Sequence, residues 1–450
     1  MDTSVLDYEV YYLLVAGVST NLTNGYLLRG TAMHAPGGHL EAWEDAGVVI
    51  SAGKITEIGE FSAVRKAYPQ LEVRDHRPGL IIPGFVDTHV HFPQLRILGG
   101  MGKHLLDWLT KYAFPEEIRM REPGYAQDVA QQFIAALIRN GTTAAVVFGA
   151  HFAQAQEELF KAALAHGFTL HSGLVWADRN VPPELIKSPS DSFRESEALI
   201  RDFHGQGGIR YTLTPRFALS VSEESLDAMQ ALLQAYPEIG VQTHLNEDPE
   251  EIAQVAQAFP WAQDYLAVYQ KAGLVRPGAI FAHNVYPSDR ELLVLAETQA
   301  GVAHCPSSNA HLGSGLFPML RHRRAGVQVG LGSDVGAGAS FSILAETRAA
   351  YQAQRLLRAE GYLLTAGELL YMATGAGAKL MGIPAGELKV GWRSDLAVLE
   401  PVTGSTLAEL LVHTDSPEEA LARWITMGGE AEIKATYLQG ELVYRKIPID

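Results

Sequence analysis

Hydrophobic residues follow two patterns along this chain, one at its two ends and another in its middle. Short β-favouring runs broken by glycine fill residues 26–82, and similar runs recur at 395–399 and 435–443. Such runs predict hairpins and a meander of strands. Because neither end alone is long enough for a comfortable domain, we expect the two ends to pair into one small β-sandwich.

The middle of the chain alternates strand-like runs with helical stretches. Eight strand-like runs end near His91, Phe148, Trp176, Phe217, His244, His283, Ser307 and Asp334. Helical stretches lie between them, among others at 126–139, 154–166, 223–235, 288–299 and 341–358. Eight such repeats predict an α/β fold, the closed parallel (β/α)8 or TIM-type barrel. The predicted domains are this barrel at 83–385 and a β-sandwich built from residues 1–82 and 386–450.

Length and composition narrow the classes of function. The 450 residues suffice for a large core, near the size at which a second domain separates. The formal net charge of −16 is dispersed along the chain, and an acidic protein repels phosphate backbones, so we expect no nucleic-acid partner. The single cysteine, Cys305, allows no internal disulfide and favours a reducing compartment.

The amino terminus lacks the basic start of a signal peptide, and its apolar run at 11–16 is short. No apolar stretch approaches the roughly 20 residues that a helix needs to cross a bilayer. We therefore expect a cytoplasmic protein that makes no membrane contact.

The most specific motif is Pro-Gly-Phe-Val-Asp-Thr-His-Val-His at 83–91, directly after an apolar run. In a strand, residues i and i+2 project from the same face, so His89 and His91 can bind one ion. His244 and Asp334 end the predicted strands five and eight, and TIM-type barrels place their chemistry at such ends. Three imidazoles and one carboxylate predict one divalent metal ion, with zinc the first candidate and iron the second.

Two further residues at strand ends suit acid–base chemistry. Glu247 stands three residues after His244, and His283 closes the predicted strand six. A catalytic metal ion lowers the pKa of a bound water towards ~7, and carboxylates nearby can then move its protons. We assign Glu247 as the general acid/base and Asp334 as a ligand that also accepts a proton. His283 would orient the hydroxide or stabilise charge on the substrate. The plain alternative for Glu247 is a carboxylate that stabilises the start of a helix.

These motifs resemble those of the amidohydrolase superfamily, and the resemblance covers nearly the whole chain. No lysine that could be carbamylated stands at 211–216, so the pattern is similar to the single-metal branch, which is rich in deaminases. Within that branch the chain resembles the guanine deaminase family at five elements in order. These are the histidine signature at 83–91, His91-Phe92-Pro93-Gln94, the loop at 106–116, Thr214-Pro215-Arg216-Phe217, and the segment at 305–317.

The resemblance implies hydrolytic deamination of guanine to xanthine and ammonia by a metal-activated hydroxide, in a homodimer. It implies that Gln94, Arg216 and Phe217 bind the purine, and Trp108 is a further candidate for contact with the ring. An arginine fork can donate to a carbonyl oxygen, and an amide can match a ring edge. The ordinary alternatives are core packing for Phe217 and Trp108 and a structural ion pair for Arg216.

Two other functions stay open. Another single-metal aminohydrolase, acting on a different purine, a pterin, a triazine or cytosine, would use the same metal ligands and differ only in its recognition residues. A scaffold or binding protein on an inactive barrel is a different class, but it would be expected to lose ligands, and none is missing here. Deaminases with a Pro-Cys-x-x-Cys zinc cluster are excluded, since the chain has one cysteine.

Overall fold

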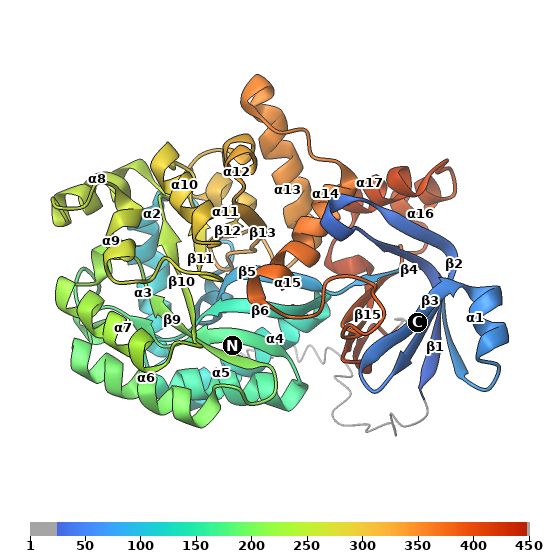
Figure 1. The fold of residues 1–450 in the computed structure, drawn as a ribbon, viewed down its shortest axis with the longest axis horizontal. Helices are drawn as coiled ribbons and strands as arrows, with labels where there is room; N and C mark the ends of the chain where they lie inside the picture. Colours follow the sequence, from blue (N-terminus) through green and yellow to red (C-terminus); the bar gives the residue numbers. More distant parts are fainter. Residues whose placement is uncertain (1–24, 448–450) are drawn as a thin grey trace, which may run out of the picture.

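The structure is a computed structural model that describes residues 25–447, and the chain forms two lobes (Figure 1). One lobe is a barrel surrounded by helices, and the other is a sheet built from both ends of the chain. Residues 1–24, which include the apolar run at 11–16, lie outside the described residues. Among residues 25–447, no helix combines the length and the apolar character needed to cross a membrane.

Eight parallel strands form the barrel, which confirms the predicted (β/α)8 fold. Backbone hydrogen bonds from Asp334 N to His89 O (2.8 Å) and from His91 N to Val335 O (2.9 Å) join the last strand region to the first. In hydrogen-bonded order the strands are β5 (Phe85–His91), β6 (Thr142–Phe148), β7 (Thr169–Gly173), β9 (Ile209–Pro215), β10 (Gly240–Leu245), β11 (Ile280–His283), β12 (Gly301–His304) and β13 (Gln328–Leu331), with the short β8 (Val175–Trp176) paired to β9.

Helices cover the outside of the barrel, in agreement with the predicted helical stretches (Figure 1). Small and β-branched side chains such as Val86, Ala144 and Ala303 fill its interior, while larger ones pack between strands and helices. The helices from the first barrel strand onward are α2 (Leu105–Trp108), α3 (Phe114–Arg119), α4 (Pro123–Arg139), α5 (Ala153–His166), α6 (Pro189–Phe203), α7 (Glu223–Ala235), α8 (Pro249–Ala258), α9 (Tyr265–Lys271), α10 (Asp289–Glu297), α11 (Pro306–His311), α12 (Met319–Ala325), α13 (Ile343–Leu356), α14 (Ala366–Ala373) and α15 (Gly375–Met381).

Three barrel strands end earlier than the sequence pattern predicted. The strand ends placed near Phe217, Ser307 and Asp334 lie instead at the ends of β9, β12 and β13. After β12 the reason is Pro306, which has no N–H for a sheet ladder and a fixed φ that suits the first turn of α11. The polar residues that follow these strands therefore lie on short loops at the carboxyl-end rim of the barrel.

The two ends of the chain form one seven-stranded sheet, as expected from their strand-like patterns. Its strands run in the order β16 (Glu441–Arg445), β15 (Ile433–Leu438), β14 (Leu396–Leu399), β4 (Glu72–Pro83), β1 (Tyr26–His34), β2 (Glu41–Ser51) and β3 (Lys54–Glu60). β1 to β3 form the predicted meander, whereas β4 returns parallel to β1 after the helix α1 (Phe61–Ala67), a pairing that the sequence did not indicate.

This sheet rolls around a core to which both chain ends contribute. β3 is an edge strand of the sheet, and its Ile55 N donates to Trp392 O (3.0 Å). This edge therefore lies next to the segment that precedes β14. Side chains from β1, β4, β14 and β15 meet in that core, among them Leu28, Ile81, Val398 and Tyr437. The helices α16 (Thr406–Leu411) and α17 (Pro417–Met427) lie between β14 and β15 in the chain. The domain boundaries at 82/83 and 385/386 stay a prediction.

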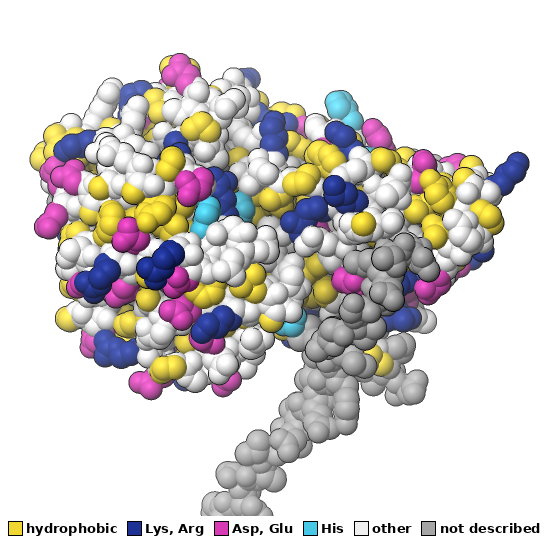
Figure 2. All heavy atoms as spheres, turned by 60° about the horizontal axis from the view of Figure 1, so that its bottom comes forward, with side chains coloured by type: hydrophobic (Ala, Val, Ile, Leu, Met, Phe, Trp, Pro, Cys, Tyr) yellow, Lys and Arg dark blue, Asp and Glu magenta, His cyan; other side chains and the backbone are white. Residues whose placement is uncertain are grey.

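Charged side chains of both signs are interspersed over the face of the molecule shown in Figure 2. Apolar side chains lie among them in small groups. The dispersion of charge that the sequence indicated is therefore also seen on this face.

An aromatic cluster supports the strand that carries the histidine pair. Phe133 of α4 is fully buried, with its ring centroid 5.8 Å from that of Phe92 and 5.7 Å from that of Phe341. Replacing Phe133 with alanine leaves a cavity at this junction, so we expect the free energy of unfolding to fall by about 3–5 kcal/mol. Chemical denaturation measures the change. The exposed neighbour Gln131→Ala should alter it little, and an equal effect of both variants would contradict this packing role.

Candidate active site

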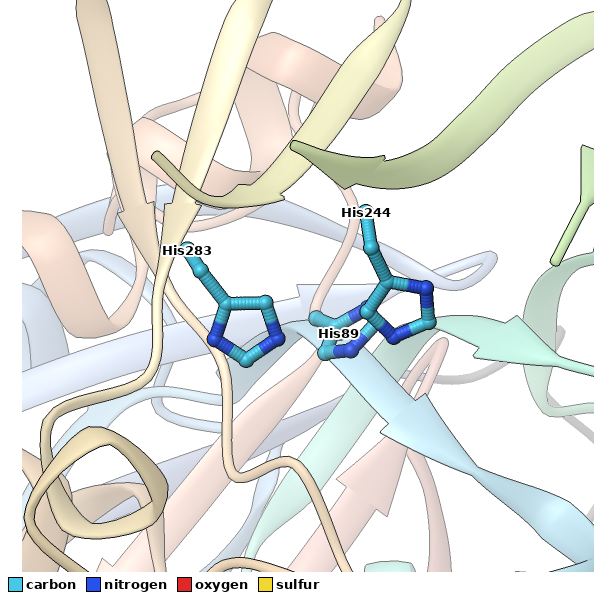
Figure 3. A group of neighbouring side chains, drawn as sticks. All are labelled: His89, His244 and His283. Atoms are coloured by element: carbon cyan, nitrogen blue, oxygen red, sulfur yellow. The ribbon is translucent and has the colours of Figure 1, made fainter. Parts of the chain in front are cut away.

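Imidazole rings from three different strands point into one space at the carboxyl ends of the barrel. Figure 3 shows His89 from β5, His244 from β10 and His283 from β11 directed towards one another. His91 and Asp334 complete the group, and all five side chains are buried. The structure therefore brings together every residue that the sequence predicted as a metal ligand.

The distances between these atoms fit a single cation. The His91 Nε2 atom lies 3.2 Å from His89 Nε2 and 3.3 Å from His244 Nε2. Asp334 Oδ1 lies 3.2 Å from His89 Nε2 and 3.3 Å from His91 Nε2. Ligands about 2.0–2.1 Å from a tetrahedral zinc ion are about 3.3 Å apart from each other. The four residues His89, His91, His244 and Asp334 could thus hold one divalent ion.

Two of the imidazole rings make hydrogen bonds on the side that faces away from the shared space. These bonds decide which nitrogen of each ring carries the proton. His244 Nδ1 lies 2.6 Å from Arg216 O, and His283 Nδ1 lies 2.9 Å from Asn309 Oδ1. Both oxygen atoms only accept, so both Nδ1 atoms must donate, and each Nε2 presents a lone pair. Lone pairs and a carboxylate facing one another repel, and a cation between them removes that repulsion. The donor set, with neutral imidazoles and one carboxylate, suits zinc or iron.

Asp334 is held in its ionised form. Burial alone would raise the pKa of its carboxyl group, but the nearby His89 and His91 hold this pKa well below its usual range. Burial and the neighbouring imidazoles lower the pKa of His244 well below its ordinary value, so this ring is neutral near pH 7. An ionised carboxylate and unprotonated rings are the forms that bind a metal ion.

A second carboxylate, Asp87, fixes the relative positions of the two ligand-bearing segments. It accepts hydrogen bonds from His89 N (3.1 Å), from Ser333 N (3.0 Å) and from the Ser333 hydroxyl. β5 and the loop after β13 are thereby joined next to the metal ligands. Asp87 lies inside the histidine signature, so the motif itself offered a signal for it, although the sequence analysis assigned it no role.

Two residues of the site have a positive φ, which is rare for residues other than glycine. His283 has φ 70° and Asp334 has φ 49°. Such left-handed conformations of non-glycine residues are uncommon and cost about 1–3 kcal/mol each, and they cluster at functional sites. Here they turn both side chains from the ends of β11 and β13 into the shared space.

Glu247 and His283 face each other beside the predicted ligands. Glu247 Oε2 lies 3.5 Å from His283 Nε2, and Asp334 Oδ2 lies 3.8 Å from the same nitrogen. His283 Nε2 and Glu247 Oε1 are buried without a hydrogen-bond partner, so both are free for a bound molecule. Burial, and after it the charge of Asp334, raises the pKa of Glu247 well above its usual range. A raised pKa lets this carboxyl group hold a proton more readily than an ordinary glutamate, as suits a group that carries a proton between two atoms.

These groups line one cavity at the carboxyl ends of the barrel strands. Its apolar wall includes Trp108 and Phe217, and Gln94 and Arg216 supply polar groups to the same cavity. Trp108 also packs in an apolar cluster and donates from Nε1 to Gly100 O (2.9 Å), so it serves the core as well. All residues predicted to contact a substrate thus line the same cavity as Glu247.

Arg216 makes the ion pair that was its alternative interpretation, and it lines the cavity at the same time. Its Nη2 lies 3.0 Å from Glu117 Oε1. Burial alone would raise the pKa of Glu117, but Arg216 and His151 hold this pKa well below its usual range. Glu117 directly follows the loop at 106–116 that resembles a known family, and the motif gave it no role. Glu251, which also lines the cavity, and Asn309, which orients His283, were missed as well.

A barrel with three imidazoles and one carboxylate converging at its strand ends is typical of a metal-dependent hydrolase. The sequence profile described as "Amidohydrolase family" matches residues 80–443, and the chain belongs to this family. This finding confirms the family resemblance that the motifs indicated.

The relatives narrow the comparison within the family. A Deinococcus radiodurans protein named "Probable guanine deaminase" is 44% identical, over 93% of this chain and 99% of its own length. The solved structure of Escherichia coli guanine deaminase has a TM-score of 0.89 at 36% identity, covering 94% of this chain and 99% of that one. A C. acetobutylicum guanine deaminase with bound guanine in its active site has a TM-score of 0.87 at 30% identity, covering 93% and 100%. These relatives confirm the resemblance to guanine deaminases.

Proposed function

We propose that this protein hydrolyses guanine to xanthine and ammonia. The observation that carries the proposal is that Glu247 and Arg216 line one cavity with three of the four predicted metal ligands, His91, His244 and Asp334. Guanine carries a carbonyl oxygen that an arginine can bind and an amine-bearing carbon that water can attack. The full-length similarity to guanine deaminases supports guanine as the substrate.

Recognition in this proposal depends on the polar wall of the cavity. The guanidinium of Arg216 donates to the carbonyl oxygen, and the amide of Gln94 pairs with an edge of the purine. Phe217 and Trp108 contact the faces of the ring, where apolar side chains suit a flat aromatic molecule. Both ring contacts also exclude water from the cavity.

The chemistry in this proposal is a proton relay around the attacked carbon. A divalent cation held by His89, His91, His244 and Asp334 would lower the pKa of water and so supply the nucleophile. Glu247 takes a proton from the attacking water and gives it to the ring nitrogen next to the amine-bearing carbon. His283 Nε2 orients the water. Asp334 then takes the second proton from the added oxygen and passes it to the amine, which leaves as ammonia. The oxygen of the water becomes the new carbonyl of xanthine.

A panel of amines tests the assignment of the substrate. The purified protein is assayed for ammonia release with guanine, oxidised guanine, a pterin, an amino-triazine and cytosine at equal concentrations. We expect kcat/KM for guanine to exceed that for every other amine. A higher value for the pterin or the triazine would assign the protein to another aminohydrolase, and no release from any amine would support a binding protein.

Replacing Arg216 with lysine tests whether substrate recognition needs the planar guanidinium or only a positive charge. Lysine keeps the positive charge beside Glu117 but loses the planar fork that can donate to a carbonyl oxygen. We expect KM for guanine to rise by about 10- to 100-fold, with the metal content unchanged. Steady-state kinetics and elemental analysis measure both quantities. An unchanged KM would remove Arg216 from substrate recognition.

The same proposal includes the identity of the metal ion, the oligomeric state and the cellular compartment. We propose zinc, with iron as the alternative, because the ligand atoms are three nitrogens and one carboxylate oxygen. We propose a homodimer and a cytoplasmic enzyme, as the family resemblance implies. Elemental analysis of the purified protein identifies the ion, and sedimentation equilibrium gives the mass of the assembly.

A further inference from the structure

One carboxylate lies behind the recognition wall of the cavity and contacts three buried polar side chains, two of which, Gln94 and Arg216, line the cavity. Glu117 Oε1 accepts from Arg216 Nη2 (3.0 Å) and from Gln94 Nε2 (2.9 Å). Glu117 Oε2 lies 3.2 Å from His151 Nε2 and 3.4 Å from Arg216 Nε. Each of these four residues is at most 4% exposed. We propose that Glu117 is a positioning residue that aligns Arg216 and Gln94 for guanine; this inference rests on the proposed function.

The contacts on Arg216 select which of its N–H groups are free. The guanidinium has five N–H groups in a rigid plane, and Glu117 engages one on Nε and one on Nη2. The remaining three cannot turn away from the cavity without breaking this fork. The ring of Phe114 lies 4.8 Å from Arg216 Cζ and restricts the plane from the side. The free N–H groups of Arg216 therefore keep one direction.

The contact on Gln94 decides the orientation of its amide. A carboxylate only accepts hydrogen bonds, so the amide nitrogen must face Glu117, and the amide oxygen must face away from it. The oxygen is then placed to accept from Gly336 N (3.3 Å), beside the predicted ligand Asp334. A glutamine at position 117 would accept or donate and would permit either orientation of the Gln94 amide. The charge of Glu117 thus sets the orientation in which the Gln94 amide stands at the cavity.

Glu117 also joins a segment that covers the cavity to three separate strands of the barrel. The covering segment, residues 105–119, supplies Trp108 to the cavity wall and carries Glu117 near its end. The partners of Glu117 follow β5, β6 and β9, namely Gln94, His151 and Arg216. The same carboxylate therefore fixes the covering segment and the recognition groups relative to each other.

The test compares two neighbouring glutamates on the same helix. Glu117→Gln removes the charge at constant size. Glu116→Gln is the matched control, since Glu116 is equally buried but bonds Arg119 and Tyr125 and does not line the cavity. We expect Glu117→Gln to raise KM for guanine by about 10- to 100-fold while kcat falls less than about fivefold. Glu116→Gln should keep both constants within about twofold, and both variants should retain the metal.

A merely structural role of Glu117 predicts a different result. Loss of stability lowers the fraction of folded enzyme and therefore kcat, with KM unchanged. A double-mutant cycle adds a second criterion: if Glu117 acts through the fork of Arg216, Glu117→Gln should raise KM at least about fivefold less in an Arg216→Lys background than in the wild type. Equal effects in the two backgrounds, or an unchanged KM in Glu117→Gln, would overturn the inference.

Two further outcomes are informative. If Glu117→Gln does not fold, Glu117→Asp keeps the charge but withdraws the carboxylate from Arg216, and KM should rise in the same direction by a smaller factor. An unchanged KM in Glu117→Asp would then overturn the inference. The wild-type enzyme is assayed with guanine first. Absence of turnover there overturns the proposed function together with this inference, whereas normal wild-type turnover with unaltered KM in the variants overturns this inference alone.

Discussion

Replacing Glu247 with glutamine should lower kcat for guanine about 1000-fold or more while the protein stays folded and keeps its metal. Glutamine has the shape of glutamate but cannot carry the proton that must pass from water to the ring nitrogen. Glu247 is the group placed for this transfer, because its Oε1 atom is buried without a partner and its Oε2 atom lies 3.5 Å from His283 Nε2.

Stopped assays of xanthine formation measure this effect, and elemental analysis shows whether the ion remains. Glu250→Gln is the matched control, because Glu250 is exposed in α8 only three residues away and does not line the cavity. Its kcat should stay within about twofold of the wild type. Activity of Glu247→Gln within a few-fold of the wild type would show that another group transfers the proton.

Removal of the metal ion should have an effect of similar size. Dialysis against a chelator is expected to lower guanine turnover at least about 1000-fold, and addition of zinc should restore it. His244→Ala should bind less than one ion per chain, because it removes one of the four converging ligands. His413→Ala, which changes an exposed histidine, should bind the same amount as the wild type. Full activity of the metal-free protein would contradict a metal-dependent reaction.

Much of the fold was predictable because the barrel repeats one simple pattern. The strands that hold His89 and His244 are buried along their whole length, and the strand before Asp334 is buried along most of its length, as is typical of parallel strands covered on both faces. Parallel strands in a closed barrel bring their carboxyl ends together, so residues far apart in the sequence could be placed at one rim. The parallel pairing of β1 with β4 was not predictable in this way, since it depends on a crossover through α1.

A residue of the candidate site was predictable from the sequence only where its residue type has few possible roles. Two histidines at positions i and i+2 of a strand have few uses other than metal binding, whereas Glu116 and Glu117 are chemically identical neighbours. Only the path of the covering segment, a succession of α-helical and π-helical turns, shows which of the two faces Arg216. No periodic pattern defines such a path. For the same reason the sequence could suggest Trp108 as a ring contact but could not separate this role from core packing.

The central claim is that water replaces the amine of guanine in the cavity that Glu247 and Arg216 share. Its most direct test is the reaction of the zinc-loaded protein with guanine in oxygen-18 water, followed by mass spectrometry of the purine and assay of ammonia. We expect xanthine with one oxygen-18 atom and one ammonia for each guanine consumed. Guanine recovered unchanged from the zinc-loaded protein, or a product without the heavy oxygen, would contradict it.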